Sequence, residues 1–195
     1  MPNWCENTLV LKHEDPTMIA RAHAAFAKGE FLNEFIPVPE DLKITSGHLG
    51  NKEEQTVLEE QQRANLTAHG YRDWYNFCIN EWGTKWDFGS GDGINEVAKN
   101  SLTVYFESAW APPTRAYAKL EELGFTVEAT YHEPGMAFVG SWEDGIEDYY
   151  DYGGEKSDSI RDLIGADLDD CYSISEALAE YEAEGERVRR WESGG

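Results

Sequence analysis

The sequence has little cysteine, little positive charge and no long apolar run. Its three cysteines, Cys5, Cys78 and Cys171, are far apart and odd in number, which indicates neither a disulfide framework nor a paired-cysteine metal or redox site. No apolar run approaches the length of about 20 residues that crosses a membrane, and no basic segment precedes an apolar one at the N-terminus. We therefore expect reduced thiols and a cytoplasmic protein that is neither secreted nor inserted in a membrane.

The scarcity of positive charge argues against direct binding of nucleic acid. The 195 residues include 16 Lys and Arg against 38 Asp and Glu, so the formal net charge is -22. Hydrophobic residues make up 41% of the chain and aromatic residues 13%, which is too apolar for a disordered protein. The protein should therefore fold around a core and repel polyanions.

A quarter of the chain holds most of this charge. Residues 141–186 contain 16 acids and 2 bases, a net charge of -14, whereas residues 1–140 contain 21 acids and 11 bases, a net charge of -10. This step in composition, followed by the flexible sequence "YGGEKSDS", predicts an internal boundary. We expect residues 1–142 to form one folded domain and residues 143–195 to form an acidic, mostly helical appendage docked on it.

The first half of the expected domain alternates between strand and helix patterns. A β-rich segment, Thr8–His13, precedes "DPTMIARAHAAFAKGE", which predicts a helix with an N-cap at Asp15 or Thr17 and a stop at Gly29. The sequence "FLNEFIPVPEDL" contains an extended stretch that two prolines end. A polar helical insertion follows near residues 53–70.

The second half repeats the alternation. The sequence "SLTVYFESAW" predicts a strand, "PPTRAYAKLEELG" a helix, and "FTVEATYHEPGMAFVGSW" two strands joined by a Glu-Pro-Gly turn. This order of elements favours an α+β fold with a ferredoxin-like antiparallel sheet and helices on one face. The other face of the sheet needs a cover or a partner.

Five motifs in residues 1–142 carry a resemblance to a known family. They are "MPNWCENTLVL", "FIPVPEDL", "NEWGTKWD", "ESAWAPP" and "YHEPGMAFVGSW", in this order. Over this range the sequence resembles the Api92-like or YubB family of bacteriophages and conjugative plasmids. The resemblance implies a ferredoxin-like fold and a mobile-element origin, and it brings no established activity.

The acidic region has a pattern of its own. If "WEDGIEDYYDYG" were helical, its carboxylates would form two neighbouring stripes and would repel one another. Further on, apolar residues at helical spacing predict amphipathic helices that dock on the domain, and Ser173 with Glu176 fits a capping box. The outer face of these helices would carry rows of acids.

Such rows can resemble the charge of a nucleic acid. Duplex DNA carries one charge per roughly 1.7 Å of axis, and a helix with two acids per turn of about 5.4 Å carries one per roughly 2.7 Å. We therefore expect an acidic surface that binds a partner: Glu143, Asp144, Glu147, Asp148, Asp151, Asp158, Asp162, Asp167, Asp169, Asp170, Glu176, Glu180 and Glu184. A surface that only keeps the protein soluble would have the same composition.

The hypothesis that follows is a non-enzymatic accessory protein that inhibits a host defence protein. Its acidic surface would mimic nucleic acid and occupy the basic groove of a nucleic-acid-binding partner of the restriction or CRISPR type. This mode of action needs no cofactor and no metal. The sequence leaves open the identity of the target and the oligomeric state.

Two other classes of function remain open. A small enzyme could use a cleft near Cys5, Trp82, Lys85 and Trp86, although large rings around a glycine more often fix a loop onto a sheet. A structural or scaffolding protein is the third class. The histidines show no metal-binding spacing.

Overall fold

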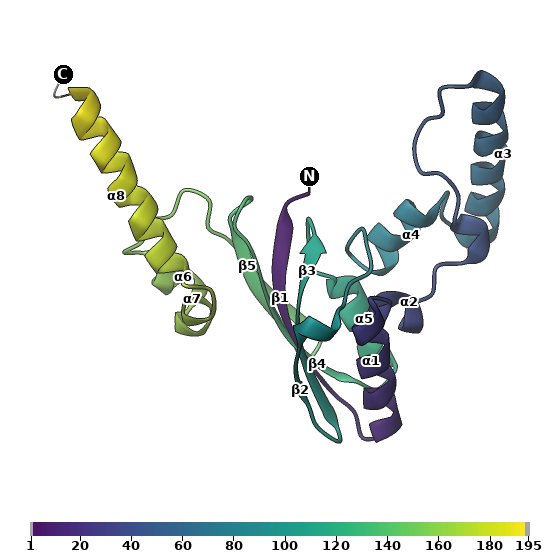
Figure 1. Cartoon of the computed structure of the whole chain (residues 1–195), viewed down its shortest axis with the longest axis horizontal. Helices are drawn as coiled ribbons and strands as arrows, with labels where there is room; N and C mark the ends of the chain where they lie inside the picture. Colours follow the sequence, from purple (N-terminus) through teal and green to yellow (C-terminus); the bar gives the residue numbers. More distant parts are fainter. Residues whose placement is uncertain (1, 194–195) are drawn as a thin grey trace.

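The computed structural model describes residues 2–193 and shows one antiparallel sheet with helices on both faces (Figure 1). In chain order the strands are β1 (Trp4–Lys12), β2 (Ile94–Val97), β3 (Ser101–Ala109), β4 (Thr126–Glu133), β5 (Phe138–Glu143) and β6 (Ile146–Asp151). Across the sheet the order is β2-β3-β1-β4-β5-β6, and every neighbouring pair is antiparallel. The α+β class and the antiparallel sheet that the sequence predicts are confirmed.

Several helices begin and end where the sequence signals them. The helices of the described residues are α1 (Pro16–Lys28), α2 (Phe31–Phe35), α3 (Lys52–His69), α4 (Trp74–Glu81), α5 (Thr114–Glu122), α6 (Ile160–Ile164), α7 (Ala166–Tyr172) and α8 (Ile174–Ser193), with 3-10 turns at Glu40–Leu42 and Gly91–Gly93. The Asp15 carboxylate accepts a hydrogen bond from Thr17 N at 2.8 Å and caps α1, which Gly29 ends in the left-handed conformation. The polar insertion is α3, which ends at Gly70.

Helix α2 corrects one expectation. The sequence predicts an extended stretch within "FLNEFIPVPEDL", but the first five residues of this segment, Phe31–Phe35, are helical. The two oxygens of Asp87 accept hydrogen bonds from Leu32 N at 2.7 Å and Asn33 N at 2.8 Å. They satisfy backbone N–H groups at the start of the helix that would otherwise have no partner. Because Asp87 is 55 positions from Leu32, no local pattern indicates this cap.

The main core lies between one face of the sheet and helices α1 and α5. Leu9, Leu11, Leu102 and Val104 alternate along β1 and β3 and are fully buried, as expected for a strand with one face in a core. The helices add Ile19, Ala22, Phe26, Ala116, Tyr117 and Leu120. This packing matches the amphipathic patterns of the sequence.

The C-terminal helices cover part of the opposite face of the sheet. In Figure 1, α6, α7 and α8 lie on the side away from α1 and α5. We call these three helices, residues 160–193, the helical cap. Their apolar residues form a second core with the end of the sheet: Val139, Tyr152, Ile160, Ile164, Leu168 and Ile174. Part of the cover that the sheet needs is therefore supplied by the chain itself.

The sheet continues past Trp142. Strand β6 pairs with β5 along its whole length, so the first acidic stretch is a strand and not a helix. Asp144 and Gly145 both have positive φ values, 51° and 75°, and form the two-residue Asp-Gly turn that favours a hairpin. The boundary expected near Trp142 therefore falls inside a hairpin, and the helical part begins at Ile160.

His132 lies in the joint between the sheet and the helical cap. Its Nε2 is 2.6 Å from the hydroxyl of Tyr152, and its ring lies 5.1 Å from that of Tyr172 at the end of α7. Burial lowers the pKa of His132 below its usual value of 6.5, although the Glu133 carboxylate acts in the opposite direction. The ring is therefore neutral in the folded protein near pH 7.

Acidification should loosen this joint through His132. Because the folded-state pKa is lowered, the unfolded chain binds the proton more readily, and the stability that the neutral ring contributes is lost as the pH falls below 6.5. Between about pH 7.5 and about pH 5, we expect His132→Phe to lose less stability in urea denaturation than the wild type. The exposed His48→Phe should follow the wild type, and parallel profiles for all three proteins would contradict this role.

Candidate acidic interaction surface

The β5–β6 hairpin holds the first group of predicted acids on a fixed support. The Glu121 carboxylate of α5 accepts hydrogen bonds from the Trp142 indole N–H and from Gly145 N, both at 3.1 Å. Trp142 is buried in the main core. The turn that carries Glu143 and Asp144 is therefore tied to a helix and to the core, so these two exposed carboxylates project from an ordered turn.

Strand β6 distributes its acids over both faces of the sheet. Glu147 and Asp151 share one face with the exposed ring of Tyr149, and Asp148 lies on the other. Glu147 Oε1 accepts a hydrogen bond from the Tyr131 hydroxyl at 2.7 Å. Burial, together with the Glu147 carboxylate, raises the pKa of Tyr131 well above its usual value of 10, so the hydroxyl remains a donor.

A glycine makes the contact between Tyr131 and β6 possible. The Tyr131 ring passes over Gly140 on β5, where an added Cβ would overlap the hydroxyl. The backbone oxygen of Asp148 is equally close to that position. Gly140 is therefore required by close approach and not by an unusual backbone angle, since its φ is not positive.

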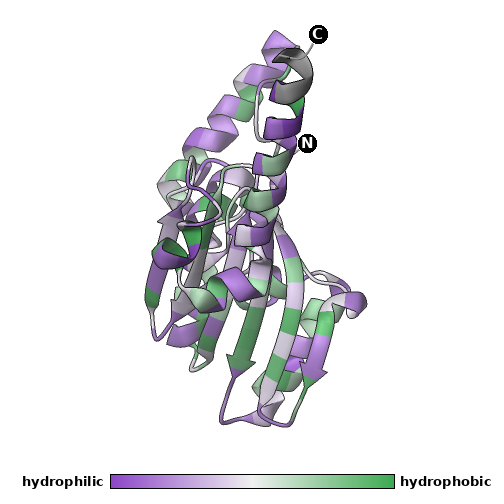
Figure 2. Cartoon of the chain, turned by 90° about the vertical axis from the view of Figure 1, so that its left-hand side faces the viewer, coloured by the Kyte–Doolittle hydropathy of each residue, from purple (hydrophilic) through white to green (hydrophobic). Residues whose placement is uncertain are grey.

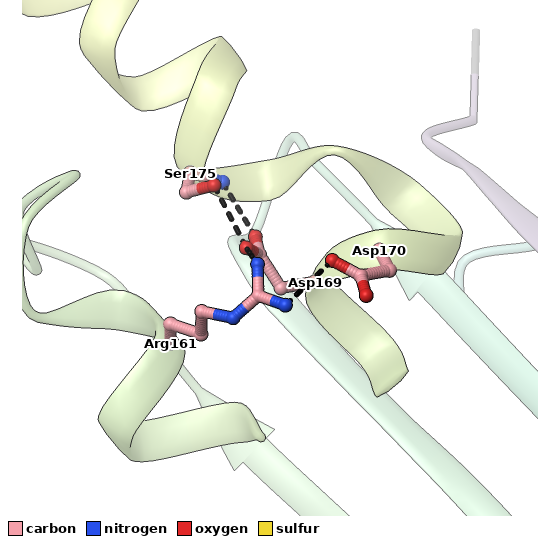
Figure 3. Close-up of polar contacts among 4 residues, drawn as sticks. All are labelled: Arg161, Asp169, Asp170 and Ser175. Carbon is pink, nitrogen blue, oxygen red and sulfur yellow. Dashed lines mark hydrogen bonds and ion pairs between the residues drawn. The ribbon is translucent and has the colours of Figure 1, made fainter. Parts of the chain in front are cut away.

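In the helical cap, one buried carboxylate joins all three helices (Figure 3). Asp169 of α7 accepts hydrogen bonds from Ser175 N at 2.7 Å and Ser175 Oγ at 2.8 Å, at the start of α8. Arg161 of α6 lies 3.2 Å from Asp169 and 2.8 Å from Asp170. Burial acts to raise the pKa of Asp169, but the bonds from Ser175 and the charge of Arg161 outweigh it, so the pKa is below its usual value of 3.8.

Asp169 also replaces the predicted cap of α8. The sequence predicts a capping box of Ser173 and Glu176, but Ser173 has a φ of 52° and ends α7 in the left-handed conformation. In the first turn of α8, the backbone N–H of Ser175 donates to Asp169 instead. The spacing of a serine and a glutamate identified the start of the helix to within one residue and missed the residue that caps it.

Twelve of the thirteen predicted partner-binding acids are exposed, and Asp169 is the exception at 2% exposure. Four exposed acids have a partner within the protein: Glu147 with Tyr131, Asp151 with Gly153 N, Asp170 with Arg161, and Glu184 with Arg187. Within residues 2–193, the other eight side chains form no hydrogen bond or ion pair: Glu143, Asp144, Asp148, Asp158, Asp162, Asp167, Glu176 and Glu180. We call these eight residues the acidic surface.

The residues of the alternative enzyme site lie in different environments. Cys5 is fully buried, and burial raises the pKa of its thiol to about 12, so the thiolate needed for nucleophilic attack does not form near pH 7. Trp82 is buried and donates a hydrogen bond from its indole to Ile36 O at 2.9 Å. Lys85 is half-buried and Trp86 is exposed, with Lys85 Nζ 4.4 Å from the Trp86 ring centre.

Two exposed tryptophans were not expected at a site. Trp4 is 44% exposed and lies 6.1 Å from Trp86, ring centre to ring centre. Trp110 is 50% exposed, has a φ of 73°, and donates from its backbone N–H to Asn3 O at 3.0 Å. The tryptophans of the "NW" and "SAW" motifs could have indicated a contact surface from the sequence, because tryptophan is enriched at protein interfaces.

The described residues show neither a metal-binding cluster nor a membrane-spanning helix. Among residues 2–193, no group of three or more His, Cys, Asp or Glu side chains is placed to hold a metal ion. Two histidines near strand ends, His13 and His132, are also not placed to share a metal ion. They lie toward opposite ends of the β1–β4 pair, since Lys12 faces Thr126 and Glu6 faces His132. Among the helices of residues 2–193, none combines the length and the apolar character that crossing a membrane requires.

Comparisons with known proteins give one structural relative. No family model matches the sequence, and no curated protein matches it. The chain is similar to the crystal structure of protein api92 from Yersinia pseudotuberculosis, of the DUF1281 family, with 12% identity and a TM-score of 0.38 over 79% of this chain and 99% of that one. The matched protein bears the name of the family that the five motifs resemble.

Neutralising Asp169 should destabilise the helical cap. Asp169→Asn removes the charge that attracts Arg161 and weakens the bonds from Ser175, at a cost of about 1.5–3 kcal/mol for buried bonds to a charged group. The neighbouring Asp170→Asn, which is exposed, should change stability by less than about 0.5 kcal/mol. Urea denaturation of the two variants measures the difference, and equal stabilities would contradict the role of Asp169.

Proposed function

We propose that the chain is a non-enzymatic accessory protein whose acidic surface binds a basic nucleic-acid-binding host protein and excludes nucleic acid from it. Host defence proteins of the restriction or CRISPR type have such basic grooves and are the partners we favour. The observation that supports this most is the set of eight exposed carboxylates without a partner in residues 2–193. Residues 141–186 contain only two bases that could neutralise these carboxylates, Lys156 and Arg161.

The support for these carboxylates is rigid, which favours binding over simple solvation. Glu143 and Asp144 sit on a turn that Glu121 fixes, and the acids of the helical cap lie on helices that Asp169 joins. Charges that are already in place before binding lose little conformational freedom when a partner docks. Charges that serve only to keep a protein in solution have no need of such fixation.

The spacing of the charges is also compatible with a phosphate backbone. A helix with two acids per turn of about 5.4 Å carries one charge per roughly 2.7 Å, and phosphates follow one another by about 3.4 Å of axis along one DNA strand. Hydrophilic residues recur along α8 between apolar ones (Figure 2), and those at Glu176, Glu180 and Glu184 are exposed acids. The surface therefore offers a field of one sign over several elements, which speeds encounter with a basic groove.

A scaffolding role is the second candidate, and a specific observation favours it. The three exposed indoles of Trp4, Trp86 and Trp110 are near one end of the β1–β3 pair. Tryptophan is enriched among the residues that contribute most to protein interfaces. Contacts made there would depend on apolar burial and would change little with salt.

Neutralisation in pairs separates these roles. Three double variants are made: Glu143→Gln with Asp144→Asn, Asp158→Asn with Asp162→Asn, and Glu176→Gln with Glu180→Gln. We expect each double variant to associate with the target roughly three- to tenfold more slowly at low salt, and the salt dependence of the association rate to become flatter. The target is first isolated from host lysate at low and high salt and then measured by surface plasmon resonance.

The control removes the same charge elsewhere. Glu53→Gln with Glu60→Gln changes two exposed carboxylates of α3, a helix that lies far from the helical cap in Figure 1, and should leave the association rate unchanged. The wild-type protein should also compete with DNA for the target. A stable ternary complex with DNA, or equal effects of all four pairs, would reject mimicry by these residues.

A further inference from the structure

Strand β6 is an open edge of the sheet. It is the last strand in the sheet order and pairs with β5 on one side. Because Tyr152 N donates to Ala137 O, the antiparallel alternation directs the N–H and C=O groups of residues 150, 148 and 146 toward β5. The same groups of Glu147, Tyr149 and Asp151 therefore point away from the sheet, and no backbone partner meets them within residues 2–193.

The side chains along this edge exclude some partners and attract others. An unpaired edge is a template for another strand, and proteins usually block it with charge, proline or a bulge. β6 contains no proline, and its register with β5 is regular. Its only charged side chains are the carboxylates of Glu147, Asp148 and Asp151, so it repels a second copy of itself and attracts a strand with positive charge.

The edge also offers an apolar contact between two of its charges. Tyr149 is 54% exposed, and its ring lies 5.4 Å from that of Phe138 on β5. Glu147 and Asp151 flank it on the same face of the sheet. A neighbouring strand would therefore meet a negative, an aromatic and a second negative side chain at successive positions on this face.

We propose that β6 binds an extended, Lys- or Arg-rich segment of the partner as a seventh strand of the sheet. The outward N–H and C=O groups of Glu147, Tyr149 and Asp151 form the ladder, and basic side chains of the segment lie against the carboxylates of Glu147, Asp148 and Asp151. This proposal rests on the proposed function, because it takes the same basic partner, and it adds how that partner is held. Strand addition gives affinity through the main chain and specificity through the side chains.

The test uses a variant that removes one outward donor and leaves the rest of the sheet unchanged. Tyr149→Pro eliminates an N–H that points to solvent, a position where an edge strand tolerates proline. Tyr149→Ala is the matched control, since it removes the ring and keeps the N–H. The probe is a synthetic peptide of eight alternating lysine and valine residues, with a second version N-methylated at alternate positions to block the ladder without changing the charge.

We expect the peptide to bind Tyr149→Ala more tightly than Tyr149→Pro by roughly fivefold or more, as for the loss of a main-chain hydrogen bond. The N-methylated peptide should bind the wild type more weakly by a similar factor. On binding of the unmethylated peptide, amide hydrogen exchange should slow at Glu147, Tyr149 and Asp151. Circular dichroism and thermal melting check that Tyr149→Pro folds, and the N-methylated peptide decides the question if it does not.

The outcomes distinguish this inference from the proposed function. If Tyr149→Pro and N-methylation leave binding unchanged while neutralisation of Glu143 and Asp144 weakens target binding, the acidic surface remains the site and strand addition is wrong. If the charge pairs have no effect on the target, the proposed function fails whatever the peptide does. A concentration-dependent dimer that Tyr149→Pro abolishes would assign the edge to a second copy and overturn the proposal.

Discussion

Burial of β4 and β5 on both faces is the constraint on which the rest of the structure depends. Successive residues of a strand point to opposite faces, so Tyr131 is buried on one face while His132 meets the helical cap on the other. On β5, Trp142 belongs to the main core and Val139 to the second core. Two cores share one pair of strands, so a change in either strand acts on both parts of the molecule.

The helical cap depends on this sharing because its own core is small. Four of its side chains are buried in the second core: Ile160, Ile164, Leu168 and Ile174. Each contributes about 1.5–3 kcal/mol when buried, whereas ordering each residue costs roughly 1–2 kcal/mol in backbone entropy. The cap therefore needs the sheet beneath it and the polar links made by Asp169. Its acids are presented rigidly only because it is docked.

The sequence predicts the elements whose signals are local. The cap of α1 at Asp15, the end of α3 at Gly70, and the β4–β5 hairpin follow from residues that are neighbours in the chain. The helix α2 does not, because Asp87, which satisfies its first N–H groups, is brought in by the tertiary fold. Local patterns contain no information about such a contact.

The sequence predicted which acidic residues belong to the candidate site, but it did not predict the elements that carry them. Thirteen of the acids between Glu143 and Glu184 were expected at a partner-binding surface, and twelve of these thirteen are exposed. The stretch "WEDGIEDYYDYG" was expected to belong to a mostly helical appendage, although repulsion among its carboxylates opposes a helix and the Asp-Gly pair at 144–145 is a hairpin signal. Asp169 has the same composition as its exposed neighbours, and only the positions of Arg161 and Ser175 separate its structural role from theirs.

Placing the acids on an edge strand gives one set of charges two physical effects. Carboxylates on β6 oppose pairing between copies of this chain, because like charges opposite one another destabilise a strand pair. The same carboxylates lower the energy of a basic segment at that edge, where the main chain of Glu147, Tyr149 and Asp151 is available. The same carboxylates thus repel an acidic strand and attract a basic one, so the charge of the approaching strand decides which effect occurs. An acidic helix without an edge could attract a basic protein but would offer it no ladder, so β6 is the part of the acidic region where charge can be converted into a defined orientation of the partner.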